Sequence, residues 1–158
     1  MECDWPNCPR YFRNNYENLN TKFAGAENIE NNWSQSMQDI FVMSMLDGKR
    51  NGVYVEIGAD QPRVISNTYL LEKDFDWSGI SFELDADKVA FFNTIRENKC
   101  LCEDATLYNY KSLFEEFNYP KQIDYLQLDI DPAEGTLRAL KALPLDDYRF
   151  SVITYETD

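Results

Sequence analysis

Short apolar runs alternate along this chain with segments in which apolar residues recur at helical spacing. Alternation of apolar and polar residues is typical of a strand, and recurrence every three or four positions is typical of an amphipathic helix. The pattern predicts five strands separated by helices, with one further helix before the first strand. The predicted strands cover 53–57, 79–84, 99–102, 123–130 and 150–155.

Start signals precede the first three predicted helices. Ser34 is expected to open a helix that runs to Asp47 and places Phe41 on its apolar face. Ser66 and Asp85 are N-cap candidates for the following two helices, because their side-chain oxygens can accept backbone N–H groups at a helix start.

The last two predicted helices follow the third and fourth strands. The first of them carries the apolar residues Leu113, Phe114 and Phe117. In the second, the sequence 131–134 places Asp at the N-cap, Pro at the first helical position and Glu at the third. That helix is expected to bury Leu137 and Leu140 and to end before Pro144.

Strands that alternate with helices over short connections indicate an α/β fold, with a mostly parallel, doubly wound, Rossmann-like sheet and helices on both faces. Residues 1–33 differ from the rest, because they hold eight Asn residues and show no clear period. We therefore expect an irregular N-terminal arm over 1–33 and one domain over 34–158.

Each predicted strand ends in acidic residues. Ligands of an open parallel sheet bind beyond the carboxyl ends of its strands, near the point where the strand order reverses. Carboxylates at the same end of five strands would form one acidic rim there. The residues concerned are Glu56, Glu83, Glu103, Asp104, Asp129, Asp131 and Glu156.

Composition narrows the chemistry. The chain has 15 Lys and Arg residues, 28 Asp and Glu residues, a net charge of −13 and no histidine. The absence of histidine excludes Ser-His-Asp and Cys-His nucleophile systems and every His-ligated metal site within this chain. The negative charge disfavours nucleic acid as a partner. Neither a signal peptide nor a membrane-spanning run is recognisable, so we expect a cytoplasmic protein.

The four cysteines occur as Cys3 and Cys8, and as Cys100 and Cys102. These spacings match a zinc site poorly, since such sites more often show two Cys-x-x-Cys pairs. Free or buried thiols are favoured over a metal site and over disulfides, and we expect no bound metal.

Gly58 and Glu83 follow the first two strands. Gly58 allows a close approach of the backbone to a ligand, although an ordinary turn explains it equally well. Pro62 and Arg63 replace the later glycines of a diphosphate-binding loop, which disfavours a dinucleotide. Glu83 suits the hydroxyls of a ribose, because Asp85 is better placed to cap the next helix.

Asp129 and Asp131 form an Asp-x-Asp pair after the fourth strand. Two such carboxylates can chelate one cation, but helix capping is the favoured role of Asp131. Asp129 is then the functional candidate. After the third strand, Asp104 and Ala105 could meet an adenine edge, and a simple loop charge remains an equal alternative.

Several of these segments together resemble the FkbM-type group of class I S-adenosylmethionine-dependent methyltransferases. The resemblance covers about residues 34–157, and the order and spacing of its motifs make it fairly specific. The matching segments are 34–39, 55–59, 66–72, 77–83 and 123–131 with Glu134.

The resemblance implies S-adenosylmethionine as cofactor and O-methylation of a hydroxyl on a sugar, polyketide or similar small molecule. It places Glu83 at the ribose, and Asp104 and Ala105 at the adenine. Asp129 would face the sulfonium and the acceptor, and it is the best candidate for the catalytic base. The methionine part would lie against Gln38, Asp39, Glu56, Gly58 and Asn67.

Two departures from the family pattern are visible. Asp60-Gln61-Pro62 replaces the usual Asn-Asp-Gly-like continuation of the first motif. The family fold also continues through a further helix and two more strands, and its members often carry His where this chain has Thr157. We therefore expect a domain that is incomplete at its C-terminus, with the cofactor half present and an open sheet edge through which two copies pair.

Two other functions compete with methyl transfer. One is a cofactor-binding module without turnover. The more remote one is a metal-dependent glycosyltransferase that uses Asp129 and Asp131 as its Asp-x-Asp pair. Methyl transfer to any acceptor would exclude the first, and stabilisation by Mn²⁺ but not by S-adenosylmethionine would favour the second.

Overall fold

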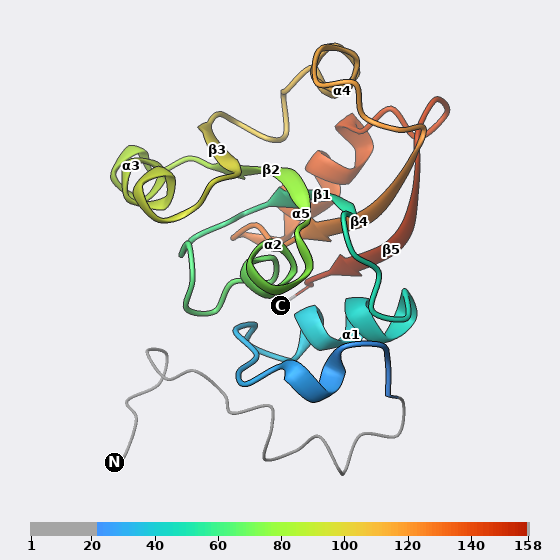
Figure 1. The fold of residues 1–158 in the computed structure, drawn as a ribbon. Coiled ribbons are helices and arrows are strands. Elements are labelled where there is room, and N and C mark those ends of the chain that lie inside the picture. Colours follow the sequence, from blue (N-terminus) through green and yellow to red (C-terminus); the bar gives the residue numbers. More distant parts are fainter. Residues whose placement is uncertain (1–21, 158) are drawn as a thin grey trace.

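The computed structural model describes residues 22–157. Its five strands form a single, wholly parallel sheet in the order β3-β2-β1-β4-β5 (Figure 1). The predicted α/β class and the parallel sheet are confirmed, and the arrangement is Rossmann-like. The strands are β1 (Val53–Ile57), β2 (Ser78–Glu83), β3 (Lys99–Cys102), β4 (Gln122–Leu128) and β5 (Arg149–Tyr155).

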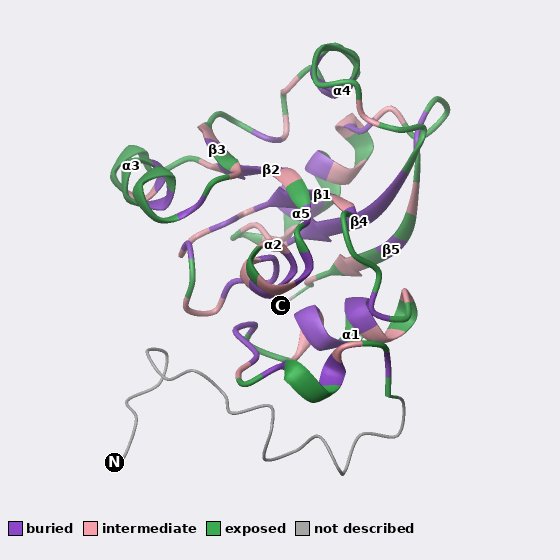
Figure 2. Cartoon of the chain, in the orientation of Figure 1, coloured by how far each residue is buried: buried purple, intermediate pink, exposed green. Residues whose placement is uncertain are grey.

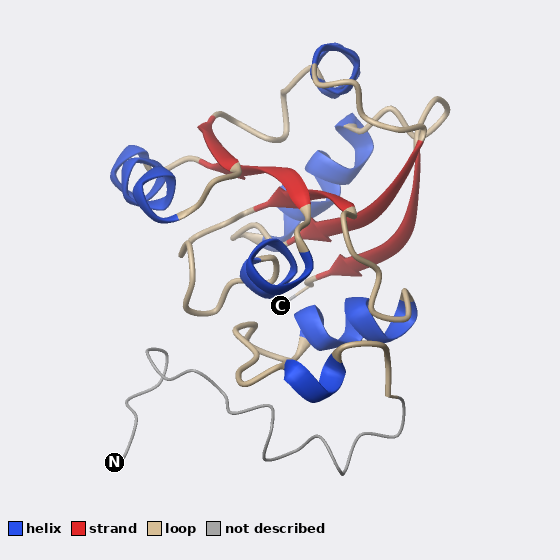
Figure 3. Cartoon of the chain, in the orientation of Figure 1, coloured by secondary structure: helices blue, strands red, loops and turns tan. Residues whose placement is uncertain are grey.

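Helices cover both faces of the sheet, as Figure 3 shows. Helices α1 and α2 pack on one face, α4 and α5 pack on the other, and α3 packs beside β3. None of the helices in the described range is long and apolar enough to cross a membrane. They are α1 (Gln38–Met45), α2 (Tyr69–Phe75), α3 (Ala86–Ile95), α4 (Tyr110–Glu116) and α5 (Ala133–Ala142).

Alternate residues of the central strands enter two separate cores. Tyr54 lies in the core under α1 and α2, whereas Val55 and Ile57 lie in the core under α4 and α5. This follows from the period of two in a strand, which sends successive side chains to opposite faces. Figure 2 shows β1 and β4 as mostly buried, while the edge strand β5 carries exposed positions such as Ile153.

The segment before α1 packs against the domain. Phe23, Ala26, Ile29 and Trp33 are buried in the same core as α1 and α2. The described end of the predicted arm therefore contributes to the core. Residues 1–21, which include Cys3 and Cys8, lie outside the described residues.

The predicted start of the first helix is wrong. Ser34 forms a bridge with Ile65, and α1 begins only at Gln38. The apolar face expected for this helix is also wrong at one position. Phe41, which was expected on that face, is 49% exposed. The reason is tertiary, since the carboxylate of Asp39 binds the backbone of Ser34 and holds that residue outside the helix.

The predicted capping role of Asp131 is also wrong. Helix α5 begins at Ala133, its cap position is Pro132, and no side chain caps it. The preceding turn is tied instead by the Thr136 hydroxyl, which bonds to both the N–H and the carbonyl of Ile130. Asp131 is left exposed.

One apolar residue expected in the core lies at the surface, because Leu137 on α5 is 44% exposed. Of the three apolar residues predicted on the helix after β3, Leu113 and Phe114 are buried in α4, whereas Phe117 directly follows the helix and is 51% exposed. By contrast, the predicted cap of α3 is confirmed, because Asp85 accepts the N–H groups of Asp87 and Lys88. Ser66 also accepts two N–H groups at the start of α2, although that helix begins only at Tyr69.

Candidate ligand-binding site

A cleft of about 730 Å³ opens at the carboxyl ends of the strands. Its centre is the junction of β1 and β4, where the strand order reverses. This is the place where open α/β sheets bind their ligands. Carboxylates from the ends of all five strands line the cleft, so the predicted acidic rim is confirmed. They are Glu56, Glu83, Glu103, Asp104, Asp129, Asp131 and Glu156.

The cleft is strongly negative. With Asp60 added, eight carboxylates line it, against two cations, Lys88 and Arg138. Lys88 forms an ion pair with Asp60. Two donors from Thr106 hold the pKa of Asp104 below its usual range, and the positive charge of Arg138 acts in the same direction. The negative charges of Glu83 and Asp85 also act on Lys88, so the positive charge in the cleft is shared among several carboxylates.

The turn after β1 passes very close to the backbone at the end of β4. Gly58 has φ +82°, and a Cβ atom there would lie 1.6 Å from the carbonyl oxygen of Asp129. Only glycine meets both demands. The N–H of Asp129 in turn donates to the Ile57 carbonyl at 3.0 Å. The close approach thus joins the ends of β1 and β4.

Residues 58–60 of the same turn donate all three of their N–H groups within the chain, so these groups are not available to cradle a phosphate. Gly58 and Ala59 both donate to the carbonyl of Phe82 at 3.0 Å. The N–H of Asp60 donates to Oε2 of Glu83 at 3.0 Å. A diphosphate-binding loop needs its N–H groups aimed at the ligand. In this chain β2 takes all three.

Glu83 is held rigidly at the edge of the cleft. Besides Asp60, the N–H groups of Leu84 and Asp85 donate to its carboxylate, at 2.8 and 3.0 Å. A carboxylate offers about four acceptor positions, so capacity remains for a ligand hydroxyl. The structure thus places Glu83 at the cleft, where three N–H groups fix the orientation of its carboxylate.

Glu56 lies at the floor of the cleft and is 1% exposed. Its Oε2 accepts a hydrogen bond of 2.6 Å from the Ser81 hydroxyl. Burial raises the pKa of Glu56, and the positive charge of Arg96 offsets part of that rise. The floor therefore carries a carboxyl group that gives up its proton less readily than an exposed one.

A row of polar side chains extends from Glu56 across the sheet. The strand register places Ser81 on one side of Glu56 and Gln127 on the other, with Thr154 beyond Gln127. Gln127 is 1% exposed, and its Oε1 accepts no hydrogen bond from the described residues. Cys100 continues the row beside Ser81, and burial raises the pKa of its thiol to about 12.

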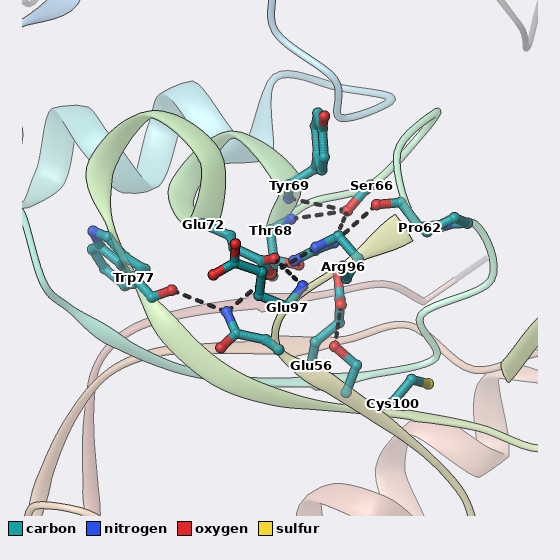
Figure 4. Close-up of polar contacts among 12 residues, drawn as sticks. Glu56, Pro62, Ser66, Thr68, Tyr69, Glu72, Trp77, Arg96, Glu97 and Cys100 are labelled. Atoms are coloured by element: carbon teal, nitrogen blue, oxygen red, sulfur yellow. Dashed lines mark hydrogen bonds and ion pairs between the residues drawn. The ribbon is translucent and has the colours of Figure 1, made fainter. Parts of the chain in front are cut away.

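A buried arginine fixes the wall of the cleft between β1 and α2. The side chain of Arg96 is fully buried and forms an ion pair of 2.6 Å with Glu72 (Figure 4). Its guanidinium also donates to the Pro62 carbonyl and to the hydroxyls of Ser66 and Thr68, at 2.9 to 3.3 Å. This network anchors both ends of the segment that carries Asn67.

Sequence reasoning did not find Arg96. It is a single arginine at the end of α3, and its partners are scattered between residues 54 and 72. Nothing in the local pattern distinguishes it from a surface arginine. Only the folded arrangement shows that it supports the cleft.

Asn67 and Gln38 both line the cleft. Gln38 is the first residue of α1, and Asn67 lies just before the start of α2. Asn67 is 7% exposed, and its Oδ1 has no hydrogen-bond partner within residues 22–157. Gln38 accepts the N–H of Ser36 at 2.7 Å. A buried amide oxygen without a donor is costly, so a ligand donor would stabilise this position.

Asp39 does not reach the cleft, unlike the other residues expected to hold the cofactor. It is fully buried and accepts the N–H groups of Trp33, Ser34 and Ile40 at 2.7, 3.2 and 2.8 Å. Its role in the fold is to hold the start of α1 against the preceding segment.

Asp104 and Ala105 line the end of the cleft beyond β3. Asp104 is exposed and accepts the N–H and hydroxyl of Thr106, whereas Ala105 is 5% exposed. Asp129 and Asp131 line the β4 side. Within the described part of the chain, no three Asp, Glu or Cys residues are grouped as a metal ion would require.

No protein-family model and no curated protein matches this chain, so any functional conclusion rests on the geometry and charge of the cleft. The cleft offers several carboxylates, the buried amide oxygen of Asn67 and little positive charge. It suits a ligand that donates hydrogen bonds and carries positive rather than negative charge.

Proposed function

We propose that this chain binds S-adenosylmethionine and transfers its methyl group to a hydroxyl of a small molecule. The observation that carries the proposal is an acidic cleft at the switch point of a Rossmann-like sheet, where residues 58–60 of the first turn donate their N–H groups within the chain. Dinucleotides place a diphosphate at this turn. S-adenosylmethionine has no phosphate and carries a net positive charge.

The proposed orientation follows the order of the strands. The ribose lies at Glu83, and the adenine lies between Asp104 and Ala105 beyond β3. The methionine part lies over Gly58, with its ammonium group near Asn67. The unpartnered Oδ1 of Asn67 supports this arrangement, because an ammonium group supplies the missing donor.

The transfer itself needs alignment and a proton acceptor. When bound, S-adenosylmethionine supplies a methyl group attached to a positively charged sulfur. Asp129, at the end of β4, is the carboxylate placed to take the proton from the hydroxyl that attacks the methyl carbon. The close approach of Gly58 to the Asp129 carbonyl fixes the backbone that carries this base, and alignment supplies most of the rate.

The proposal is tested by replacing Glu83 with Gln and measuring S-adenosylmethionine binding by calorimetry. A charge-assisted hydrogen bond contributes about 1.5–3 kcal/mol, so affinity should fall about tenfold or more. Glu116→Gln is the matched control, since Glu116 is exposed and lies outside the cleft. Equal affinity in both variants would contradict the proposal.

The second candidate function is a module that binds S-adenosylmethionine but does not transfer its methyl group. A binding measurement alone does not separate this module from an enzyme. Incubation with methyl-labelled S-adenosylmethionine and a panel of hydroxylated compounds separates the two. Label transferred to an acceptor, and lost in Asp129→Asn, establishes the enzyme. Saturable binding with no transfer to any acceptor would favour the module.

A further inference from the structure

We propose that Arg63 is a positioning residue for the methionine end of the cofactor. It holds the loop between β1 and α2 against the segment that precedes α1, and this loop carries Ile65 and Asn67 in the wall of the cleft. Arg63 is not among the described residues that line the cleft. The inference rests on the proposed function and deepens it, because it names a residue that acts on cofactor binding through its neighbours.

The loop is joined to the N-terminal segment by two contacts, which we call the clasp. The first is a stack of Arg63, an exposed residue, on an aromatic pair. Its guanidinium carbon lies 4.4 Å from the centroid of the Trp33 ring and 5.8 Å from that of the Tyr69 ring. The two rings pack edge to face at 5.1 Å, and Trp33 belongs to the core under α1 and α2. A cation is attracted to the face of such a ring, so the loop is held against a fixed point.

The second contact of the clasp lies two residues further along the loop. Ile65 forms a parallel β-bridge with Ser34, the residue after Trp33. Both residues of the N-terminal segment are fixed in turn, because the carboxylate of Asp39 accepts the N–H groups of Trp33 and Ser34 at 2.7 and 3.2 Å. The first turn of α1 therefore supports the clasp.

The backbone of Ile65 explains why the loop needs to be held. Its φ is +57°, in the left-handed region. A β-branched residue is rarely found there, and such a conformation persists only where surrounding contacts impose it. Arg96 holds the loop at Pro62 on one side of Ile65 and at Ser66 on the other. The clasp acts between these two points.

The strained residue lies at the cleft, close to the buried amide of Asn67. Ile65 and Asn67 line the cleft from the loop, and Gln35 and Gln38 line it from the other side of the clasp. Asn67 is 7% exposed, and its Oδ1 has no hydrogen-bond partner within residues 22–157. The proposed function places the ammonium group of the methionine part at this oxygen. The clasp therefore sets where this wall lies relative to the cofactor.

Two neutral ligands test the inference, because they differ in the amino-acid part. S-adenosylhomocysteine and methylthioadenosine share the adenine, the ribose and the thioether sulfur, and only the first carries an amino-acid group. In Arg63→Gln, affinity for S-adenosylhomocysteine should fall about two- to fivefold by calorimetry, as the loss of an exposed cation over an aromatic ring implies. Affinity for methylthioadenosine should stay unchanged, since this ligand has no group for Asn67.

Arg50→Gln is the matched control. Arg50 is also exposed, and its guanidinium carbon lies 5.6 Å from the centroid of the Phe75 ring in the same core, but Arg50 is not among the described residues that line the cleft. Its replacement removes an ion pair with Asp76 as well. Affinity for both ligands should stay unchanged in this variant. A loss confined to Arg63→Gln then cannot come from lower stability alone.

The strain at Ile65 gives a second test with the same measurement. Asn adopts the left-handed region more readily than Ile, so in the background Ile65→Asn the loop depends less on the clasp. The loss of S-adenosylhomocysteine affinity that Arg63→Gln causes should be smaller in this background than in the unaltered chain. An equal loss in both backgrounds would overturn the action of Arg63 through Ile65.

Amide hydrogen exchange tests the clasp without a ligand. Exchange over residues 62–67 should be faster in Arg63→Gln than in the unaltered chain, because the loop opens more often. Arg50→Gln should leave it unchanged. Equal exchange in Arg63→Gln and the unaltered chain would overturn the inference, and this result decides if methylthioadenosine binds neither chain.

The binding results separate failure of the inference from failure of the proposed function. Unchanged affinity for S-adenosylhomocysteine in Arg63→Gln would overturn the inference, as would equal losses for both ligands. A loss confined to S-adenosylhomocysteine and absent from Arg50→Gln supports it. If the unaltered chain binds neither S-adenosylmethionine nor S-adenosylhomocysteine, the proposed function is overturned, and the role of Arg63 in cofactor binding with it.

Discussion

Asp39 shows how one carboxylate can look like a ligand contact and yet belong to the fold. In the sequence it follows Ser34 closely and matches the segment before the first motif of the family. In the structure it is fully buried and receives three backbone N–H groups and the Ser34 hydroxyl. Which partner a carboxylate binds depends on the path of the chain, and the residue pattern does not contain that path.

Replacing Asp39 with Asn should destabilise the protein. The amide removes the buried charge that four donors converge on, and it places an NH₂ group among them. The free energy of unfolding should fall by about 2–4 kcal/mol, measured by urea denaturation. Asp146→Asn, at an exposed position, should change it by about 0.5 kcal/mol or less. Equal stability of the two variants would show that Asp39 does not hold the start of α1.

Glu56 should make stability depend on pH. Burial raises its pKa above the ordinary value of 4.5, so the folded chain holds this proton more tightly than the unfolded chain does. Its contribution to stability is therefore present at low pH and is lost as pH rises from about 4.5 through the raised pKa. The variant Glu56→Gln stays neutral throughout.

The difference in unfolding free energy, variant minus unaltered chain, should therefore increase between about pH 4 and pH 7. Urea denaturation at several pH values measures it, and other titrating groups cancel in the difference. A difference that stays constant over this range would contradict the raised pKa of Glu56.

At the scale of elements, the strands were predictable and the helix starts were less so. Strands β1 and β3 have the predicted bounds, and the others differ by one or two residues at an end, because a period of two and a buried run are local signals. Helix starts depend on which side chain reaches which N–H group. Asp85 caps its helix, whereas Asp131 does not, although both sequences contain the usual signal.

The candidate site was likewise predictable only in part. The acidic rim was predictable, because parallel strands bring their carboxyl ends to one edge whatever the details of packing. The buried polar residues that support this rim were not predictable. Arg96 and Gln127 acquire their roles only through contacts with residues far away in the sequence.

Arg96→Lys tests that support. Lysine keeps the charge but cannot form the forked contacts to Pro62, Ser66 and Thr68. The free energy of unfolding should fall by about 2–4 kcal/mol, as is usual when a buried charge network is broken. Arg50→Lys is the control, because its ion pair with Asp76 is exposed and should contribute little. Similar losses in both variants would argue against a special role for Arg96.

Gly58→Ala tests the junction between β1 and β4. A methyl group there would collide with the Asp129 carbonyl, in addition to the strain of a positive φ. Gly25→Ala carries the same strain, with φ +86°, but its Cβ would meet only Phe75 at an ordinary 3.5 Å. Gly25→Ala should cost about 1–2 kcal/mol by denaturation, and Gly58→Ala clearly more. Equal costs would mean that the close approach at Gly58 is easily relaxed.

For the whole molecule, charge and topology point in the same direction. The chain carries a net charge of −13, and eight of its carboxylates line the cleft at the switch point. A doubly wound sheet by itself suits dinucleotides as well as S-adenosylmethionine. The distribution of negative charge and the occupied N–H groups after β1 are the observations on which we propose S-adenosylmethionine rather than a dinucleotide.

The most direct measurement is therefore calorimetric titration of the unaltered chain with S-adenosylmethionine and, separately, with NAD⁺. We predict saturable binding of S-adenosylmethionine at one site and no binding of NAD⁺, because its diphosphate would meet carboxylates and the already bonded N–H groups of residues 58–60. Binding of NAD⁺ without binding of S-adenosylmethionine would contradict the account.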